Sequence, residues 1–246
     1  MTDNQNIPDV VYKYLDFETG IEKVLKNKTI KFSTPSSFND PFDCYEVLIE
    51  QKAKVSREKQ GFSGFFKTDY EEADKFLRKE NAEVFRRLKE QIRITSFSKC
   101  YRNILMWSHY GQKHTGVCIG VSTILNKSEF SKVSYETIIT PKPFDDLGEK
   151  KNNIDAINYW LNTKSNDWEY EGEIRIVSRD MPEYSKFNSE VVKEIIFGLK
   201  VPSEKVKNKI KELQLYGYEH VKFYQMKEIE NEFRIEKKLI NIEDIS

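Results

Sequence analysis

The stretch SFSKCYRNILMWSHYGQKHTGVCIGV, residues 96–121, contains the clearest secondary-structure signals in the sequence. It indicates the end of a strand, a polar turn, a short aromatic-rich helix over Asn103–Tyr110 that Gly111 stops, and a buried strand over Gly116–Val121. Together with the strands expected elsewhere in the chain, this succession predicts a mixed α+β fold.

Further strands and helices are expected on both sides of this stretch. Short apolar or alternating runs predict strands at Val10–Tyr14, Thr29–Ser33, Ile92–Ser98, Val133–Thr137, Tyr170–Val177, Val191–Phe197, His220–Met226 and Phe233–Leu239. Apolar residues spaced by threes and fours predict helices at Phe17–Leu25, Tyr70–Leu88 and Asp155–Leu161, and a fourth that Ser203 caps. No linker divides the 246 residues, so we expect one domain whose strands surround a single cleft.

Composition excludes several classes of protein. Lys plus Arg and Asp plus Glu both number 40, so the chain has no bulk charge with which to grip nucleic acid. The three cysteines are far apart and form no CxxC, which supports neither a disulfide framework nor a zinc cluster. No apolar run approaches the roughly 20 residues of a membrane span. We therefore expect a cytoplasmic protein that needs no metal.

The segment WEYEGEIRIV, residues 168–177, is the first candidate for chemistry. In a continuous strand, alternation places Glu171, Glu173 and Arg175 on one face, opposite the apolar residues. Two carboxylates and a guanidinium on one face could serve a reaction. The alternative is a solvated strand face whose ion pair contributes at most about 1 kcal/mol to stability.

Two other segments carry polar and aromatic candidates. In FSTPSSFNDPFD, residues 32–43, Asn39 and Asp40 either contact a ligand or form Asx turns with their own backbone. In residues 96–121, His109 and Tyr110 suit a planar heterocycle, although both are also compatible with core positions. Trp107 is expected in the core. The sequence contains no P-loop, GxGxxG, HExxH, GxSxG or EF-hand motif.

These segments resemble a bacterial family, the domain of unknown function numbered twenty-nine seventy-one. The marks that carry the resemblance are VYKY at 11–14, IKFSTPSSFNDPFD at 30–43, FSK at 97–99, MWSHYGQKHTGVCIG at 106–120, WEYEGEIRIV at 168–177 and EIIFG at 194–198. They extend over nearly the whole chain. The family name itself implies no activity.

The order of these elements is also similar to the ADP-ribosyltransferase fold. VYKYL takes the place of the first motif, SFSK through HYG the third, and EGEIRIV the strand with the catalytic Glu. The resemblance implies a single α+β domain over residues 1–246 with a split, antiparallel-rich central sheet and flanking helices. A helical insertion near 65–90 and a C-terminal strand–helix–strand extension near 190–240 would complete it. The His or Arg usual in the first motif is replaced by Tyr12, Lys13 or Tyr14.

The resemblance implies cleavage of the nicotinamide–ribose bond of NAD and transfer of ADP-ribose to a macromolecular acceptor, as in some toxins and phage-defence proteins. Glu173 would stabilise the oxocarbenium-like transition state, and Glu171 would orient or deprotonate the acceptor. The residues that would bind NAD are Lys13, Tyr14, Asn39, Asp40, Phe97, Ser98, His109, Tyr110 and Arg175. The acceptor could be a protein side chain, a nucleic-acid base or water.

Two functions from other classes remain open. One is a metal-independent toxin-like nuclease that uses Lys13, His109 and Glu173 as acid and base. The other is a non-catalytic nucleotide-binding or interaction module on a degenerate transferase fold, which the replaced His or Arg favours.

Overall fold

The structure, a computed structural model, describes residues 7–51, 83–144 and 150–241. The chain divides into two compact units, which are described separately. The first comprises Met1–Ser33, Arg93–Val133 and Asp167–Ser246, and the second comprises Thr34–Ile92 and Ser134–Asn166. The expectation of a single domain, with its insertion and extension, stays a prediction.

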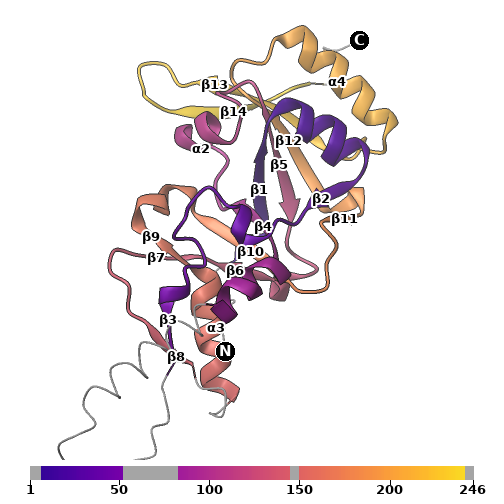
Figure 1. Cartoon of the computed structure of the whole chain (residues 1–246). Helices are drawn as coiled ribbons and strands as arrows, with labels where there is room; N and C mark the ends of the chain where they lie inside the picture. Colours follow the sequence, from indigo (N-terminus) through magenta and orange to yellow (C-terminus); the bar gives the residue numbers. More distant parts are fainter. Residues whose placement is uncertain (1–6, 52–82, 145–149, 242–246) are drawn as a thin grey trace, which may run out of the picture. The chain divides into compact units, whose positions relative to one another are not determined.

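An eight-stranded sheet forms the centre of the first unit (Figure 1). Its spatial order is β14-β13-β12-β5-β1-β4-β10-β6, and all neighbours are antiparallel except β12 and β13. The strands are β1 (Val10–Leu15), β4 (Arg93–Ser98), β5 (Val117–Ser122), β6 (Phe130–Lys132), β10 (Glu173–Ser178), β12 (Val192–Phe197), β13 (Lys222–Glu228) and β14 (Ile235–Leu239). The predicted α+β class and antiparallel-rich sheet are therefore confirmed.

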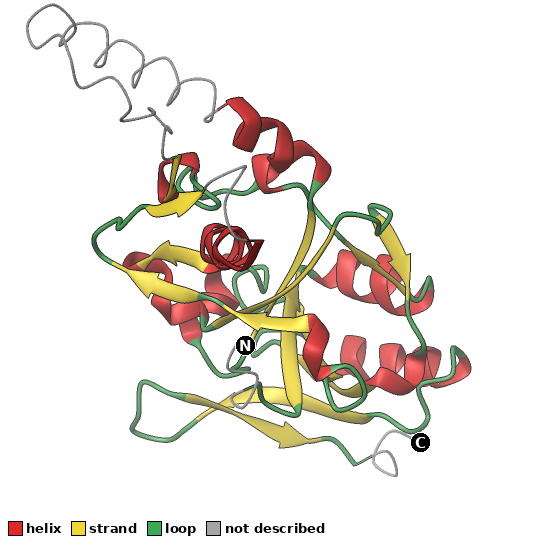
Figure 2. Ribbon diagram, turned by 90° about the horizontal axis from the view of Figure 1, so that it is seen from below, coloured by secondary structure: helices red, strands yellow, loops and turns green. Residues whose placement is uncertain are grey.

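Two helices cover one face of this sheet. The π-helix η2 (Thr19–Lys26) buries Ile21, Val24 and Leu25, and Asn27 is its C-cap residue. It shares a core cluster with α4 (Ser203–Leu215), whose Val206, Ile210 and Leu213 recur at the spacing of one helical face. Figure 2 shows the helices of the structure in red and its strands in yellow. The α4 helix is confirmed, but its cap is not Ser203. Pro202 occupies that position, and no side chain closes the cap.

The short helix α2 (Ile104–His109) packs on the opposite face. Its Met106 and Trp107 join Tyr14 of β1 and Cys118 of β5 in a second cluster. Asn103 caps the helix by accepting hydrogen bonds from two backbone N–H groups of the first turn. The predicted helix and the core position of Trp107, which is fully buried, are confirmed.

The sheet is weakly joined between β1 and β4. These strands share one registered pair, Tyr12 with Ser98, whereas β1 pairs with β5 over all six of its residues. Beyond that pair, the Lys13 ammonium donates to the carbonyl oxygen of Ser96 at 2.8 Å. A side chain of β1 thus makes a hydrogen bond to β4 where the two strands share no registered pair.

Smaller elements complete the first unit. They are β2 (Thr29–Lys31) paired with β11 (Tyr184–Lys186), and the 3-10 helices η5 (Lys127–Glu129), η6 (Asn166–Glu171) and η7 (Ser189–Val191). The prediction that a strand runs from Tyr170 to Val177 is wrong at its start. Tyr170 and Glu171 belong to η6, and β10 begins at Glu173.

The second unit is built around helix α3 (Lys150–Asn162), which is longer than the predicted Asp155–Leu161. Its Trp160 is fully buried, packs edge-on against Phe85, and donates to the Cys44 carbonyl at 2.7 Å. Residues 83–91 are helical, and the rest of the helix predicted at Tyr70–Leu88 lies outside the described residues. The remaining elements are η3 (Pro35–Ser37), η4 (Glu46–Leu48), β3 (Ile49–Gln51), β7 (Ser134–Glu136), β8 (Lys142–Phe144) and β9 (Thr163–Ser165).

Candidate functional site

A row of side chains crosses three adjacent strands of the first unit. Ser98 of β4 lies opposite Tyr12 of β1 on one side and opposite Glu173 of β10 on the other. Directly paired residues of antiparallel strands point to the same face of the sheet. The row Tyr12–Ser98–Glu173 therefore occupies the α2 face, at the one registered pair between β1 and β4.

Glu173 forms a bidentate ion pair with Arg175, two residues along the same strand. The Arg175 Nε atom lies 2.7 Å from Glu173 Oε1, and Nη2 lies 3.0 Å from Oε2. Both residues are buried, with 4% of Glu173 and none of Arg175 exposed. The predicted shared face of these two residues is confirmed, while the alternative of a solvated face is wrong. Charge-assisted pairs of this geometry are strong and fix both side chains.

Glu171 lies just before this pair, in η6 rather than in the strand. It is joined to β10 by Gly172, whose φ of +50° places it in the left-handed region. The Glu171 carboxylate is buried and accepts a 2.6 Å hydrogen bond from the Tyr110 hydroxyl. The predicted strand alternation therefore does not position Glu171. The turn at Gly172 and the hydroxyl from the end of α2 position it instead.

Ser98 ties this turn to β4. Its hydroxyl donates to the Glu171 carbonyl oxygen at 2.6 Å and accepts from the Cys100 N–H at 3.2 Å. The Lys99 N–H donates to the Gly172 carbonyl oxygen at 2.9 Å. Two backbone segments far apart in the sequence are thus held together at the base of the two carboxylates.

Tyr170 and Asn103, which sequence reasoning did not single out, connect α2 to the same turn. The Asn103 amide donates to the Tyr170 carbonyl oxygen at 2.7 Å, and the Tyr170 hydroxyl lies 3.1 Å from Nδ1 of His109. Tyr170 lies within the segment WEYEGE, which the sequence had already marked as a candidate site through Glu171 and Glu173. Asn103 was detectable as a helix cap but not as a link to η6.

Tyr14 lies on the α2 face in a packed position. Its hydroxyl donates to the Cys100 carbonyl oxygen at 2.8 Å, and its ring meets Trp107 edge-on at 5.2 Å. Burial raises the pKa of Tyr14 far above its ordinary value. These contacts describe a core tyrosine, and its predicted contact with NAD stays a prediction.

Lys13 and Phe97 are not brought together with Glu173. Each is adjacent in sequence to a member of the row, so strand alternation sends both to the opposite face. There the Lys13 ammonium lies 5.4 Å from the centre of the Phe97 ring and donates to Thr95 Oγ1 at 3.1 Å. Burial lowers the pKa of Lys13 to about 8, and the charge of Glu173 opposes this shift.

Asn39 and Asp40 belong to the second unit. Oδ1 of Asp40 accepts from the Phe42 N–H at 2.9 Å, which is the geometry of an Asx turn. Asp40 therefore forms the Asx turn that was expected as the alternative to contact with a ligand. The predicted role of both residues in binding a nucleotide stays a prediction.

Within the described ranges, no three His, Cys, Asp or Glu side chains gather as a potential metal site. The described helices include none with the length and apolar character that crossing a membrane requires.

The first unit therefore presents two buried carboxylates, those of Glu171 and Glu173, at an antiparallel-rich sheet of an α+β fold. Residues 106–176 match the model of a family described as a protein of unknown function, DUF2971. The matched stretch contains the last four residues of α2, all of β5 and the first four residues of β10, and supports the family resemblance there. No match was found among curated proteins or solved structures.

Proposed function

We propose that the protein cleaves the bond between nicotinamide and ribose in NAD and transfers ADP-ribose to a macromolecular acceptor. The observation that carries the proposal is the row Tyr12–Ser98–Glu173 across β1, β4 and β10, with Glu171 two residues from its end. It assembles a hydroxyl, two carboxylates and a tyrosine from three separate stretches of the chain. Such convergence of polar groups on one sheet face is typical of a reaction site.

Glu173 is the proposed stabiliser of the transition state. Bond cleavage leaves positive charge on the ribose ring as nicotinamide departs with the bonding electron pair. A carboxylate beside the ring offsets that charge and accepts a hydrogen bond from a ribose hydroxyl. Arg175 holds the Glu173 carboxylate in a fixed orientation, so its position does not have to reorganise during the reaction.

Glu171 is the proposed base. It accepts the proton that the acceptor loses when its nucleophilic atom bonds to the ribose carbon. The Tyr110 hydroxyl, 2.6 Å from Glu171 Oε1, orients this carboxylate. The acceptor is a protein side chain, a nucleic-acid base or water, and neither carboxylate depends on which it is.

The test is nicotinamide release from NAD, measured by chromatography with and without cell extract as a source of acceptor. Glu171→Gln is the cleanest variant, because Tyr110 can still donate to the new amide oxygen. We expect Glu171→Gln to reduce turnover by roughly 100-fold or more. Glu183→Gln, which changes an exposed glutamate paired with Lys31, is the matched control. Absence of nicotinamide release by the wild type, or full activity of Glu171→Gln, would contradict the proposal.

One observation favours a second candidate, a non-catalytic nucleotide-binding or interaction module. Glu173 is buried and both of its oxygens accept from Arg175, as in a structural ion pair. Calorimetric binding of NAD without nicotinamide release, both with and without extract, would support this candidate. No such observation favours the metal-independent nuclease. That function would use Lys13 and Glu173 together as acid and base, and the two residues lie on opposite faces of the sheet.

A further inference from the structure

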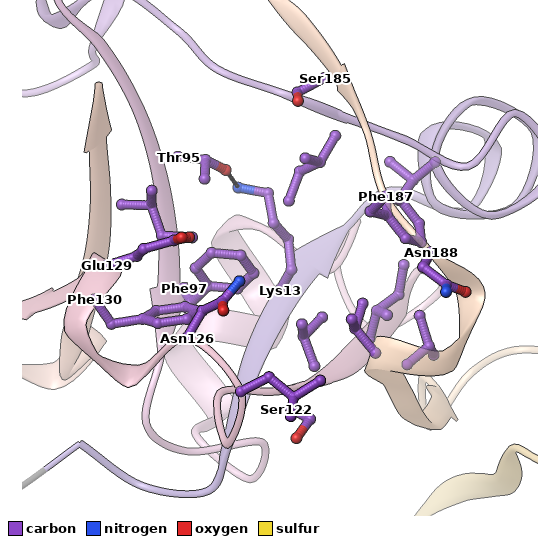
Figure 3. Close-up of a pocket in the computed structure, with 18 of the residues that line it drawn as sticks. Lys13, Thr95, Phe97, Ser122, Asn126, Glu129, Phe130, Ser185, Phe187 and Asn188 are labelled. Atoms are coloured by element: carbon purple, nitrogen blue, oxygen red, sulfur yellow. Dashed lines mark hydrogen bonds between the residues drawn. The ribbon is translucent and has the colours of Figure 1, made fainter. Parts of the chain in front are cut away.

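The first unit contains a cavity on the sheet face opposite Glu173 (Figure 3). Its volume is about 750 Å³, which is within the usual range for small-molecule sites. The walls are mainly apolar and come from several strands, with Phe97, Ile119, Val121, Phe130 and Ile176 among them. The size and lining suit an apolar ligand.

Lys13 places a positive charge in this cavity away from its exposed charged residues, which are Lys186, Lys193, Glu129 and Glu190. In Figure 3 its side chain extends from β1 toward Thr95 and passes over the Phe97 ring. Its hydrogen-bond acceptors are Thr95 Oγ1 and the Ser96 carbonyl oxygen, both neutral. Among the described residues, no carboxylate lies within ion-pair distance of the ammonium. An ammonium has three donors, so a third N–H remains for a ligand.

Apolar side chains also surround the entrance. Ile124 and Leu125 line the cavity, yet 62% and 88% of their surfaces are exposed. Met181, contributed by the segment after β10, lies on the same lining and is 39% exposed. A ligand with an apolar body would cover these side chains and remove their surface from water.

We propose that this cavity binds an apolar monocarboxylate, with its carboxylate at Lys13 and its hydrocarbon body along the aromatic and aliphatic wall. Among the lysines of the lining, Lys186 and Lys193 are exposed and Lys13 is not, so one ammonium is available to one negative charge beside the apolar wall, where the second charge of a phosphate would have no partner. The Thr95 hydroxyl accepts from Lys13 and keeps its own proton to donate to the carboxylate.

The cavity is independent of the proposed NAD site. Strand alternation separates Lys13 from the row Tyr12–Ser98–Glu173, so the two ligands would occupy opposite faces. NAD should therefore not displace the carboxylate. Failure of the NAD proposal would leave this one standing, and the reverse also holds.

The test is calorimetric titration of the full chain with decanoate and with decanol, which share a hydrocarbon body and differ in charge. We expect decanoate to bind, and decanol to bind about tenfold more weakly. Lys13→Met keeps the apolar stem and should abolish this preference. Lys193→Met, which changes an exposed lysine on the lining of the same cavity, should preserve it.

A second variant tests the cavity in case Lys13→Met does not fold. Ile176→Trp keeps the ammonium but fills part of the cavity, so it should weaken both ligands by about tenfold or more. Equal affinities for decanoate and decanol, unchanged decanoate binding in Lys13→Met, or displacement of decanoate by NAD would each overturn the proposal. Absence of binding by both ligands would also overturn it.

Discussion

At the scale of single residues, the buried Glu173–Arg175 pair shows what strand alternation predicts and what it does not. Alternation correctly places both side chains on one face. Their burial depends on segments far away in the sequence, so the alternating pattern alone is equally compatible with a solvated pair. The difference matters because a buried pair and a solvated pair respond very differently to the loss of one charge.

We predict that Glu173→Gln lowers the free energy of unfolding by about 3–5 kcal/mol, because it removes the carboxylate charge of the bidentate pair with the buried Arg175 guanidinium. The double variant Glu173→Gln/Arg175→Met should regain most of this loss, since it removes both charges. Urea unfolding of the three proteins measures the effect. A change below about 1 kcal/mol in the single variant would mean that water still reaches the pair.

Tyr110 should contribute to stability through its hydroxyl. Tyr110→Phe removes the donor to the buried Glu171 carboxylate, and we expect a loss of about 1–3 kcal/mol in unfolding free energy. Tyr216→Phe, at an exposed tyrosine, is the control and should change stability little. If Tyr110→Phe unfolds at the same urea concentration as the wild type, the hydrogen bond is not stabilising.

Lys13 should make stability depend on pH in a defined window. Its pKa is about 8 in the folded protein and near 10.5 when the chain is unfolded, so the unfolded chain binds more protons between these values. The cost of burying the charged form is full below pH 8 and disappears as pH rises toward 10.5. Unfolding free energies of the wild type, minus those of Lys13→Met, should therefore rise with pH across this window. A flat difference would show that Lys13 keeps an ordinary pKa, and a falling difference would show that folding raises this pKa.

At the scale of elements, apolar runs and helix-stop residues predicted the long strands and α2, whereas most of the three-residue strands were not predicted. Gly111 marked the end of α2, and short apolar or alternating runs marked β1, β4 and β12. Three-residue strands such as β6 and β11 carry no periodic pattern, because their pairing partners define them. The turn at Gly172 was missed for a related reason. WEYEGEIRIV continues a strand pattern through a residue whose backbone leaves the strand conformation.

Gly172→Ala should destabilise the protein by about 1–2 kcal/mol, because a Cβ is strained at its positive φ. The added methyl would also meet the Lys99 side chain at 2.8 Å. Gly217→Ala is a matched comparison, since φ there is also positive but the nearest atom is 3.5 Å away. Thermal melting of both variants separates backbone strain from crowding. Unchanged melting of Gly172→Ala would show that the turn readjusts at no cost.

At the scale of the whole molecule, the sequence predicted the fold class but not the division into two units. Each unit is assembled from separated stretches of chain, and no linker marks the crossings at Ser33, Arg93, Val133 and Asp167. Composition detects boundaries only where a flexible or polar segment joins two domains. The candidate site shows the same limit. Its carboxylates were recognisable in the segment WEYEGEIRIV, but the hydroxyl that donates to Glu171 comes from Tyr110 at the end of α2, far away in the sequence.

The single registered pair between β1 and β4 has a consequence for how the native protein opens. On one side, β1, β5 and β12 are joined by long ladders, and on the other, β4 and β10 are joined over six pairs. Cooperative opening units in proteins follow such contiguous ladders. We therefore expect amide hydrogens to exchange with deuterium in two groups, with the β4–β10 amides sharing one opening free energy and the β1–β5–β12 amides another. Mass-spectrometric exchange that shows one common rate across Tyr12 and Ser98 would mean that the sheet opens as a single unit.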